Sequence, residues 1–263
     1  MAMLVERSDP GVEQADEISL GLLGRFEIAD HRTAATVPVP AQRLAAFLAV
    51  RDEPVGRPRA SGVLWPEVEH DHALSNLRTA LWRLRNLHPG LVRTLGTTLT
   101  IAPDVRIDLR ESEVLAHRIL QEALPLVDAR RAAGSLSHDL LPDWEDEWLE
   151  FDRERFRDLR VRALERLCGR LSELGAHAEA AEAGLLALQA DPLRESSCVA
   201  LMHAYTAEGN EASALQLYRA LEGRLERELQ VSPSPTTAEL ARELQGLARL
   251  DAAPVVRPVS ASG

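Results

Sequence analysis

Apolar residues recur at helical spacing between Asp71 and Leu87, in the stretch DHALSNLRTALWRLRNL. Their i, i+3, i+4, i+7 pattern predicts an amphipathic helix with Asp71 as its N-cap, ended by the sequence HPG at 88–90. No acidic residue follows Asp71 in this helix, so the outward side is cationic, hydroxyl and amide in character. The apolar face comprises Ala73, Leu74, Leu77, Ala80, Leu81 and Leu84.

The polar face of this helix suits a DNA major groove. Arginine donates to guanine edges and phosphates, asparagine pairs with adenine, and threonine contacts a methyl group or a phosphate. Trp82 lies about 130° from the centre of the apolar stripe, which turns its ring away from the core. An ordinary solvated helix, with the indole covering an edge of the fold, is the alternative interpretation. The candidate DNA contacts are Ser75, Asn76, Arg78, Thr79, Trp82, Arg83, Arg85 and Asn86.

The patterns on either side of this helix predict the rest of one domain. A hairpin with its tip at Gly96-Thr97-Thr98 is expected directly after the helix. The order strand, strand, three helices, hairpin is that of a winged helix-turn-helix, whose hairpin lies beside the minor groove. The segments are a strand at Ile18–Ile28 bent at Gly21 and Gly24, an extended piece at Thr36–Val39, helices at Ala41–Val50 and Arg59–Leu64, and the hairpin at Leu91–Ile101.

From Asp108 onward the apolar pattern is helical throughout. Glycine and proline residues interrupt it at intervals, as is typical of helix ends. The expected helices cover Leu109–Leu126, Asp128–Ala133, the residues between Pro142 and Gly175, His177–Ala190, Pro192–Glu208 with Asp191 as its cap, Glu211–Leu229 and Thr237–Leu250.

These helices contain an internal period of 34 residues. This is the tetratricopeptide period, in which a small residue forms the turn and the second helix packs through small side chains. The alternative is that ordinary helices align by coincidence. The matched pairs are Gly175 with Gly209, Ala178 with Ala212, Ala180 with Ala214, and Leu171 with Tyr205.

Length and charge refine this division. The chain has 263 residues, of which 45% are hydrophobic, enough for two ordinary domains with buried cores. Its net charge of −11 is uneven: −4 over 1–17, +2 over 18–108 and −9 over 109–263. This distribution favours a site-specific DNA binder whose basic surface lies in one segment. We expect a disordered leader (1–17), a DNA-binding domain (18–108), a helical-repeat domain (109–250) and a disordered tail (251–263).

Signals for membranes, secretion and catalysis are missing from the sequence. It contains no apolar run that could cross a bilayer and no signal peptide, and its two cysteines, Cys168 and Cys198, suit a reducing compartment. We therefore expect a cytoplasmic protein. The phosphate-loop, GxGxxG, GxSxG and HExxH motifs are absent, and the pair His70 and His72 has no further ligands nearby in the sequence. We expect no catalytic residue, no cofactor and no metal site.

With these features laid out, the chain resembles the Streptomyces antibiotic regulatory protein family, from roughly Ile18 to Leu244. The matching stretches are GLLGRFEI, PAQRLAAFLAV, VLWPE, ALSNLRTALWRLRN, LLPDWEDEWLEFDRER, ADPLRE and ALQLYRALEGRLERELQVSPSP. Family members join a response-regulator-type winged helix to a bacterial transcriptional activator domain of tetratricopeptide-like repeats. The resemblance implies a mainly α fold with a small β component, built from these two domains.

The resemblance also implies a function and a set of contacts. It implies an activator that binds direct repeats near promoter −35 regions and recruits RNA polymerase holoenzyme to a secondary-metabolite gene cluster. A homodimer and tandem protomers on DNA are both compatible with direct repeats. The wing departs from the family, whose members often have an arginine followed by a glycine-aromatic pair; this chain has no aromatic there. The wing candidates are Arg93, Thr97 and Thr98, and the recognition-helix positions are those of Ser75, Asn76, Thr79, Trp82, Arg83 and Arg85.

Two hypotheses from different classes follow. The first is a site-specific transcriptional activator, in which Arg83 reads a guanine. The second is a non-enzymatic adaptor whose repeats bind a protein and whose winged helix is a dimerisation module. The absence of acids from the outward face of the Asp71–Leu87 helix favours the first. An RNA-binding protein is disfavoured, because aromatic residues make up only 4% of the chain.

Overall fold

The structure is a computed structural model that describes residues 18–29, 36–51 and 53–251. These residues form two compact units. The first unit is drawn from residues 1–111 together with 141–150, and the second from 112–140 together with 151–263. The predicted leader at 1–17 lies outside the described residues, as does the predicted tail at 251–263 apart from Asp251.

Two small sheets belong to the first unit. In one sheet, β1 (Ser19–Gly21) pairs antiparallel with β2 (Glu27–Ala29) and parallel with β6 (Arg106–Ile107). In the other, β5 (Thr98–Ile101) lies between β3 (Val55–Gly56) and β4 (Val92–Leu95). The sequence did not predict β3 or β6, because a strand of two residues is too short to show alternation.

The prediction of one strand over Ile18–Ile28 is wrong. That stretch is a hairpin in which Leu20 of β1 lies opposite Ile28 of β2. Gly24, which was expected only to bend the strand, has a φ of +80° and lies in the turn that reverses the chain.

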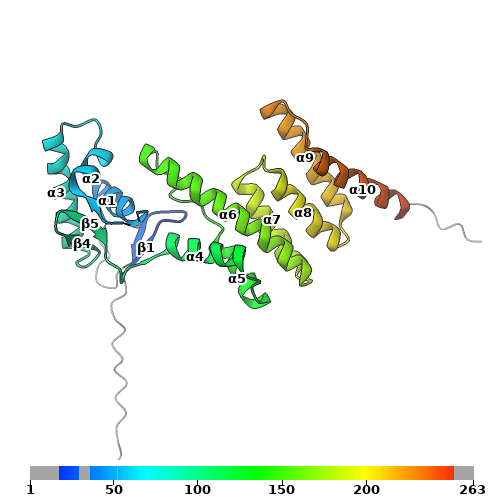
Figure 1. Cartoon of the computed structure of the whole chain (residues 1–263), viewed down its shortest axis with the longest axis horizontal. Coiled ribbons are helices and arrows are strands. Elements are labelled where there is room, and N and C mark those ends of the chain that lie inside the picture. Colours follow the sequence, from blue (N-terminus) through cyan, green and yellow to red (C-terminus); the bar gives the residue numbers. More distant parts are fainter. Residues whose placement is uncertain (1–17, 30–35, 52, 252–263) are drawn as a thin grey trace, which may run out of the picture. The chain divides into compact units, whose positions relative to one another are not determined.

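Three helices carry the core of the first unit, with α3 packed against both α1 and α2 (Figure 1). Residues 36–38 form no strand and lead directly into α1.

The N-cap of α3 is Glu69, which makes no side-chain capping hydrogen bond. The prediction of Asp71 as the cap is therefore wrong, because the helix begins earlier and Asp71 lies in its first turn. The helices are α1 (Val39–Ala49), α2 (Arg57–Leu64) and α3 (His70–Leu87).

Residues 141–150, which we call the strap, belong to the first unit although the sequence placed them in the second. The Leu141 N–H donates to the Leu22 carbonyl at 2.9 Å. Trp144 stacks on Phe26 at 5.7 Å between ring centroids, and Trp148 meets the Phe47 ring edge-on at 5.2 Å. The sequence predicts one domain boundary, between 108 and 109. In the structure the first unit consists of two segments of the chain, because the ring contacts of the strap are made with residues of that unit.

The described residues of the second unit are mainly helical. In it α7 packs on α8, α8 on α9 and α9 on α10, as Figure 1 shows. The prediction that a helix starts at Pro192 is wrong, because residues 191–194 form a turn in which the Arg194 N–H donates to the Asp191 carbonyl at 3.3 Å. The helices are α4 (Asp108–Gln121), α5 (Leu126–Ser135), α6 (Glu147–Glu173), α7 (His177–Ala190), α8 (Glu195–Ala207), α9 (Glu211–Leu229) and α10 (Pro235–Asp251), of which α4 and α6 begin in the first unit.

The 34-residue period is a structural repeat. Gly175, after α6, and Gly209, after α8, have φ values of +76° and +80°, a conformation that glycine adopts without strain. The hydrogen bonds around them recur at the same spacing: the Ala176 N–H donates to the Leu171 carbonyl at 2.9 Å, and the Asn210 N–H donates to the Tyr205 carbonyl at 2.8 Å. The turn predicted from the sequence is confirmed in both copies.

The cysteines are packing residues of this unit. Both are free and buried, and burial raises the pKa of the Cys168 thiol to about 11 and that of Cys198 to about 12. Cys168 lies where α7 approaches closely: a Cβ added to Gly184 would come 3.2 Å from the Cys168 Sγ and 3.0 Å from the Leu201 Cβ. A side chain at position 184 would therefore require Leu201 and Cys168 to move by a few tenths of an ångström.

Candidate nucleic-acid interface

Helix α3 turns its apolar stripe inward and its polar face to solvent. Ala73, Leu77, Ala80, Leu81 and Leu84 are buried, as the periodicity predicts. All eight predicted contacts on this helix are exposed: Ser75, Asn76, Arg78, Thr79, Trp82, Arg83, Arg85 and Asn86.

These exposed positions form a central row and two flanks. At the helical rotation of about 100° per residue, the positions farthest from the buried stripe make up the central row. Asn76 and Arg83 lie on one flank, and Arg78 and Arg85 lie on the other. The central row consists of Ser75, Thr79, Trp82 and Asn86.

A groove of about 300 Å³ runs along the flank that carries Asn76 and Arg83. The sequence did not predict it, because its walls come from three separate elements. The apolar lining includes Pro38 and Pro40, at the start of α1, and Trp65, directly after α2; the polar lining consists of Asn76, Thr79 and Arg83.

Trp82 and Arg83 contact each other on the surface of α3. The Arg83 Cζ lies 5.2 Å from the centroid of the Trp82 ring, and 56% of Trp82 is exposed. A cation–π contact at an exposed site contributes about 0.5–1 kcal/mol. It therefore restrains the guanidinium, while the N–H donors at the edge of its plane remain available.

The opposite flank of α3 is tied to the wing, the hairpin β4–β5. An Nη of Arg85 donates to the Thr94 hydroxyl. At the tip, the Arg57 N–H donates to the Thr97 carbonyl at 3.3 Å, and the Thr98 hydroxyl donates to the Leu95 carbonyl at 2.8 Å. Both α2 and α3 therefore hold the wing in place.

The predicted wing contacts differ in their surroundings. Arg93 and Thr97 are exposed, whereas Thr98 is half-buried and already hydrogen-bonded. Arg93 forms an ion pair with Asp104 at 3.6 Å, with both side chains largely exposed. Leu95, which was not among the predicted contacts, is 54% exposed at the tip beside Gly96. The signal was present, since the alternation that buries Leu99 and Ile101 in β5 leaves Leu95 with no core position.

The arginines of α3 differ in their surroundings from the paired Arg93 of the wing. Within the described part of the chain, no ion pair involves Arg78, Arg83 or Arg85, and Asp71 in the first turn is the last acidic residue of the helix. The same described residues contain no group of three His, Cys, Asp or Glu side chains that could hold a metal ion. The chemistry of this face is therefore cationic and hydrogen-bonding.

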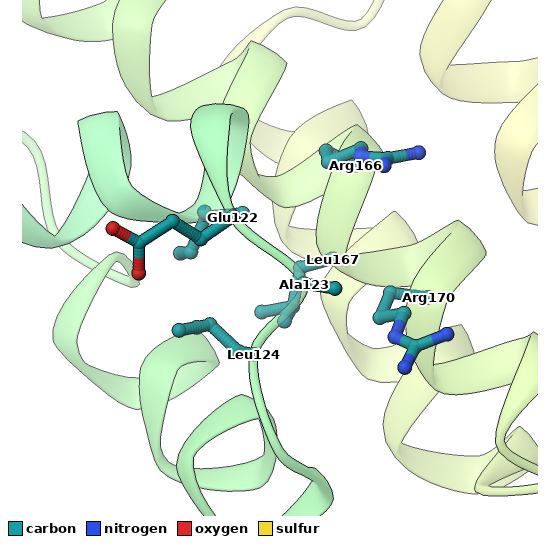
Figure 2. Close-up of a pocket in the computed structure, with 7 residues that line it drawn as sticks. Glu122, Ala123, Leu124, Arg166, Leu167 and Arg170 are labelled. Atoms are coloured by element: carbon teal, nitrogen blue, oxygen red, sulfur yellow. The ribbon is translucent and has the colours of Figure 1, made fainter.

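A small pocket also lies in the second unit. Figure 2 shows Glu122, Ala123 and Leu124 of the α4–α5 connection on one side and Leu167 of α6 on the other, with the Glu122 carboxylate turned away from Arg166 and Arg170. Its volume is about 10 Å³, the space of a single water molecule. We assign no ligand to it.

Residues 106–245 match the family model of the bacterial transcriptional activator domain, and this stretch is more than half of the chain. The chain belongs to this family. The matched stretch begins at β6 and ends within α10, so it includes most of the second unit.

Two comparisons with individual proteins extend the match. The regulatory protein AfsR of Streptomyces griseus is 29% identical over 78% of this chain and 22% of its own length, so the chain spans less than a quarter of that relative. The solved structure of Mycobacterium tuberculosis EmbR, in complex with a low affinity phosphopeptide, superposes with a TM-score of 0.68 at 20% identity, over 88% of this chain and 65% of EmbR. At this identity the likeness shows the fold.

These matches confirm the resemblance to the Streptomyces antibiotic regulatory protein family and the fold class expected from it. The matched family model describes a transcriptional activator domain, and the relative AfsR is named a regulatory protein. No helix among the described residues is both long and apolar enough to span a membrane.

Proposed function

We propose that this member of the bacterial transcriptional activator domain family binds specific duplex DNA through α3 and the wing and activates transcription. The observation that carries the proposal is the exposed, acid-free face of α3 beside a hairpin. Its arginine, asparagine, serine and threonine side chains are donors suited to base edges and phosphates in a major groove. If the exposed face of α3 served only solubility, acidic side chains would serve there as well as basic ones.

The wing contacts the DNA backbone next to the site of α3. Arg93 and Thr97 contact phosphates, and Thr98 does so by giving up its hydrogen bond to the Leu95 carbonyl. Leu95 packs in the minor groove, where apolar side chains are commonly inserted. Arg93 must exchange Asp104 for a phosphate. An exposed ion pair is worth at most about 1 kcal/mol, so this exchange costs little.

The target and the partner follow from the family. The sites are direct repeats near promoter −35 regions, occupied by protomers in tandem or by a homodimer, and the partner is RNA polymerase holoenzyme. The second unit supplies the protein-binding surface, because stacked helical repeats expose extended faces for partners. The regulated genes form a secondary-metabolite biosynthetic cluster, and the protein works in the cytoplasm, where these partners are.

The test is selection of bound sequences from a random duplex pool with the full chain, at low and at moderate salt. We expect a direct repeat spaced by about one helical turn and an affinity that falls as salt rises. The matched control is Arg78→Glu, which places a carboxylate on the acid-free face and should abolish enrichment without unfolding the exposed helix. No enriched sequence from the unaltered protein would contradict the proposal.

The activation step needs a separate test. Transcription from a promoter that carries the selected repeat, with RNA polymerase holoenzyme, should increase when the protein is added. Specific DNA binding without activation would refute polymerase recruitment and leave DNA binding in place. Neither binding nor activation would favour the adaptor hypothesis, in which the repeats bind another protein.

A further inference from the structure

The groove beside α3 separates Arg83 from the residues that point straight outward. Arg83 and Asn76 lie on the flank of the helix and line the groove. Thr79 of the central row also lines it, whereas the other central-row residues do not: Ser75, Trp82 and Asn86. Arg83 is thus placed differently from a side chain that projects from the middle of the helix face.

A helix inserted in a major groove meets different parts of the DNA on different sides. The major groove is about 12 Å wide, and a helix with its side chains is about 10–12 Å across, so the fit is close. The central row faces the base edges on the floor of the major groove. The flanks face the sugar-phosphate strands that form its two sides.

The composition of the groove fits a sugar-phosphate strand. Trp65, Pro38 and Pro40 offer apolar surface for the deoxyribose, while Arg83 and Asn76 supply N–H donors for the phosphate oxygens. None of the described residues that line the groove carries a carboxylate. The Thr79 hydroxyl is already directed to the Ser75 carbonyl, at 3.1 Å, which leaves Arg83 and Asn76 as the principal donors.

We infer that this groove holds the backbone of one DNA strand, with Arg83 and Asn76 on a phosphate and Trp65 against the sugar. The inference rests on the proposed function. It assigns Arg83 to a phosphate, whereas the sequence predicts that Arg83 reads a guanine. Arg83 is a positioning residue that sets the depth and register of α3, and base preference comes from the central row. The contact with Trp82 holds the guanidinium beside the groove.

The experiment compares Arg83→Gln with Asn86→Ala in the full chain. Both residues are exposed, so neither substitution should unfold α3. For each variant, affinity is measured from about 50 to 200 mM salt, and base preference is measured by selection from a duplex pool. Losing one phosphate contact lowers the slope of log affinity against log salt by about 0.9, which reduces the loss of affinity over this range about three-fold.

We expect Arg83→Gln to weaken binding to all sequences equally, to lower the salt slope by about 0.9 and to leave the base preference unchanged. Asn86→Ala should flatten the preference at one position and keep the slope. A second groove variant, Asn76→Asp, should weaken binding to every sequence, because its carboxylate repels the phosphate.

The opposite pattern would overturn the inference. If Arg83→Gln flattens the preference at one base pair and leaves the salt slope unchanged, Arg83 reads a base and the groove does not hold the backbone. That result is distinct from failure of the proposed function, since it requires the unaltered protein to select a sequence. If the unaltered protein selects no DNA sequence, both the inference and the proposed function are overturned.

Discussion

The arginines of α3 differ from those that join helices in the second unit. Three arginines of the second unit pair with acids on other helices, whereas Arg78 and Arg83 on α3 have no ion-pair partner in the described structure. Pairs of the second unit are Arg130 with Glu179 at 2.7 Å, Arg155 with Glu113 at 2.8 Å, and Arg194 with Glu165 at 3.0 Å. The same residue type therefore joins helices at these three pairs and is left available for a ligand on α3.

Glu165 shows how the second unit uses such pairs. It lies on α6 and accepts hydrogen bonds from Arg194 Nε and from the hydroxyls of Ser196 and Ser197, the last two at 2.7 Å. These donors surround the start of α8. The network fixes one helix against the next, so charge here contributes to packing between repeats.

Reversing the charge of α3 is expected to have the largest effect. Arg78→Glu with Arg83→Glu should lower duplex affinity by at least about 100-fold, because two cations are lost and two anions face the phosphates. The matched control is Arg157→Glu with Arg162→Glu in the second unit, where both arginines have acidic neighbours. Duplex affinity is measured by fluorescence anisotropy. Equal losses of affinity in the two double variants would show that the arginines of α3 are no more important for DNA binding than the paired arginines of the second unit.

Removing a strap contact should come next in size. Trp148→Ala deletes the edge-on contact with Phe47 and the hydrogen bond from Trp148 Nε1 to Asp146, which is 2.9 Å long. We expect the first unit to lose about 2 kcal/mol of stability, seen as faster amide hydrogen exchange in α1. Trp82→Ala, at an exposed ring, is the control and should leave exchange unchanged. Unchanged exchange in Trp148→Ala would mean that the strap does not stabilise the first unit.

Packing in the second unit can be tested with a glycine pair. Gly184→Ala forces a Cβ against Leu201 and Cys168 and should cost about 1–3 kcal/mol. Gly169→Ala, in α6, meets nothing within 4 Å and should stabilise by about 0.5–1 kcal/mol through helix propensity. Both are measured as the shift of the denaturant midpoint. A stabilising Gly184→Ala would show that α7 and α8 are not closely packed there.

The smallest expected effect is a pH dependence at Glu195. Burial raises the pKa of its carboxyl, but hydrogen bonds from Thr237 and Ser234 outweigh burial, and the pKa is lower than the ordinary 4.5. A lowered pKa adds stability above the unfolded value, and this stability is lost as the pH falls through the folded value. The Ser234 N–H donates to Glu195 at 2.8 Å, which ties the start of α10 to α8.

Glu195→Gln should therefore reduce stability by about 1 kcal/mol at pH 7. The difference from the unaltered protein should shrink as the pH falls from the unfolded pKa of 4.5 through the lower folded pKa, where the wild-type carboxyl becomes protonated. Urea unfolding at several pH values, monitored in the second unit, measures this difference. A gap that stays constant from neutral to acidic pH would show that the charge of Glu195 is not responsible.

Local patterns sufficed for the long helices and the repeat. The apolar stripe of α3 and the bounds of α7 and α9 follow from 3.6-residue periodicity and from the breakers between the helices. Gly175 and Gly209 signalled their turns because only glycine takes a positive φ without strain. These features depend on residues that are close in sequence, so the sequence carries them directly.

For the candidate site, the sequence by itself determined which side chains α3 presents to solvent, through their spacing along one helix. Only the tertiary structure decided that Arg83 lines a groove with Trp65 and Pro38, that Arg85 is tied to the wing, and that the strap joins the first unit. Each of these contacts joins residues of different structural elements. The physical reason is that periodicity reports on which face of an element is buried and carries no information about which distant element packs beside it.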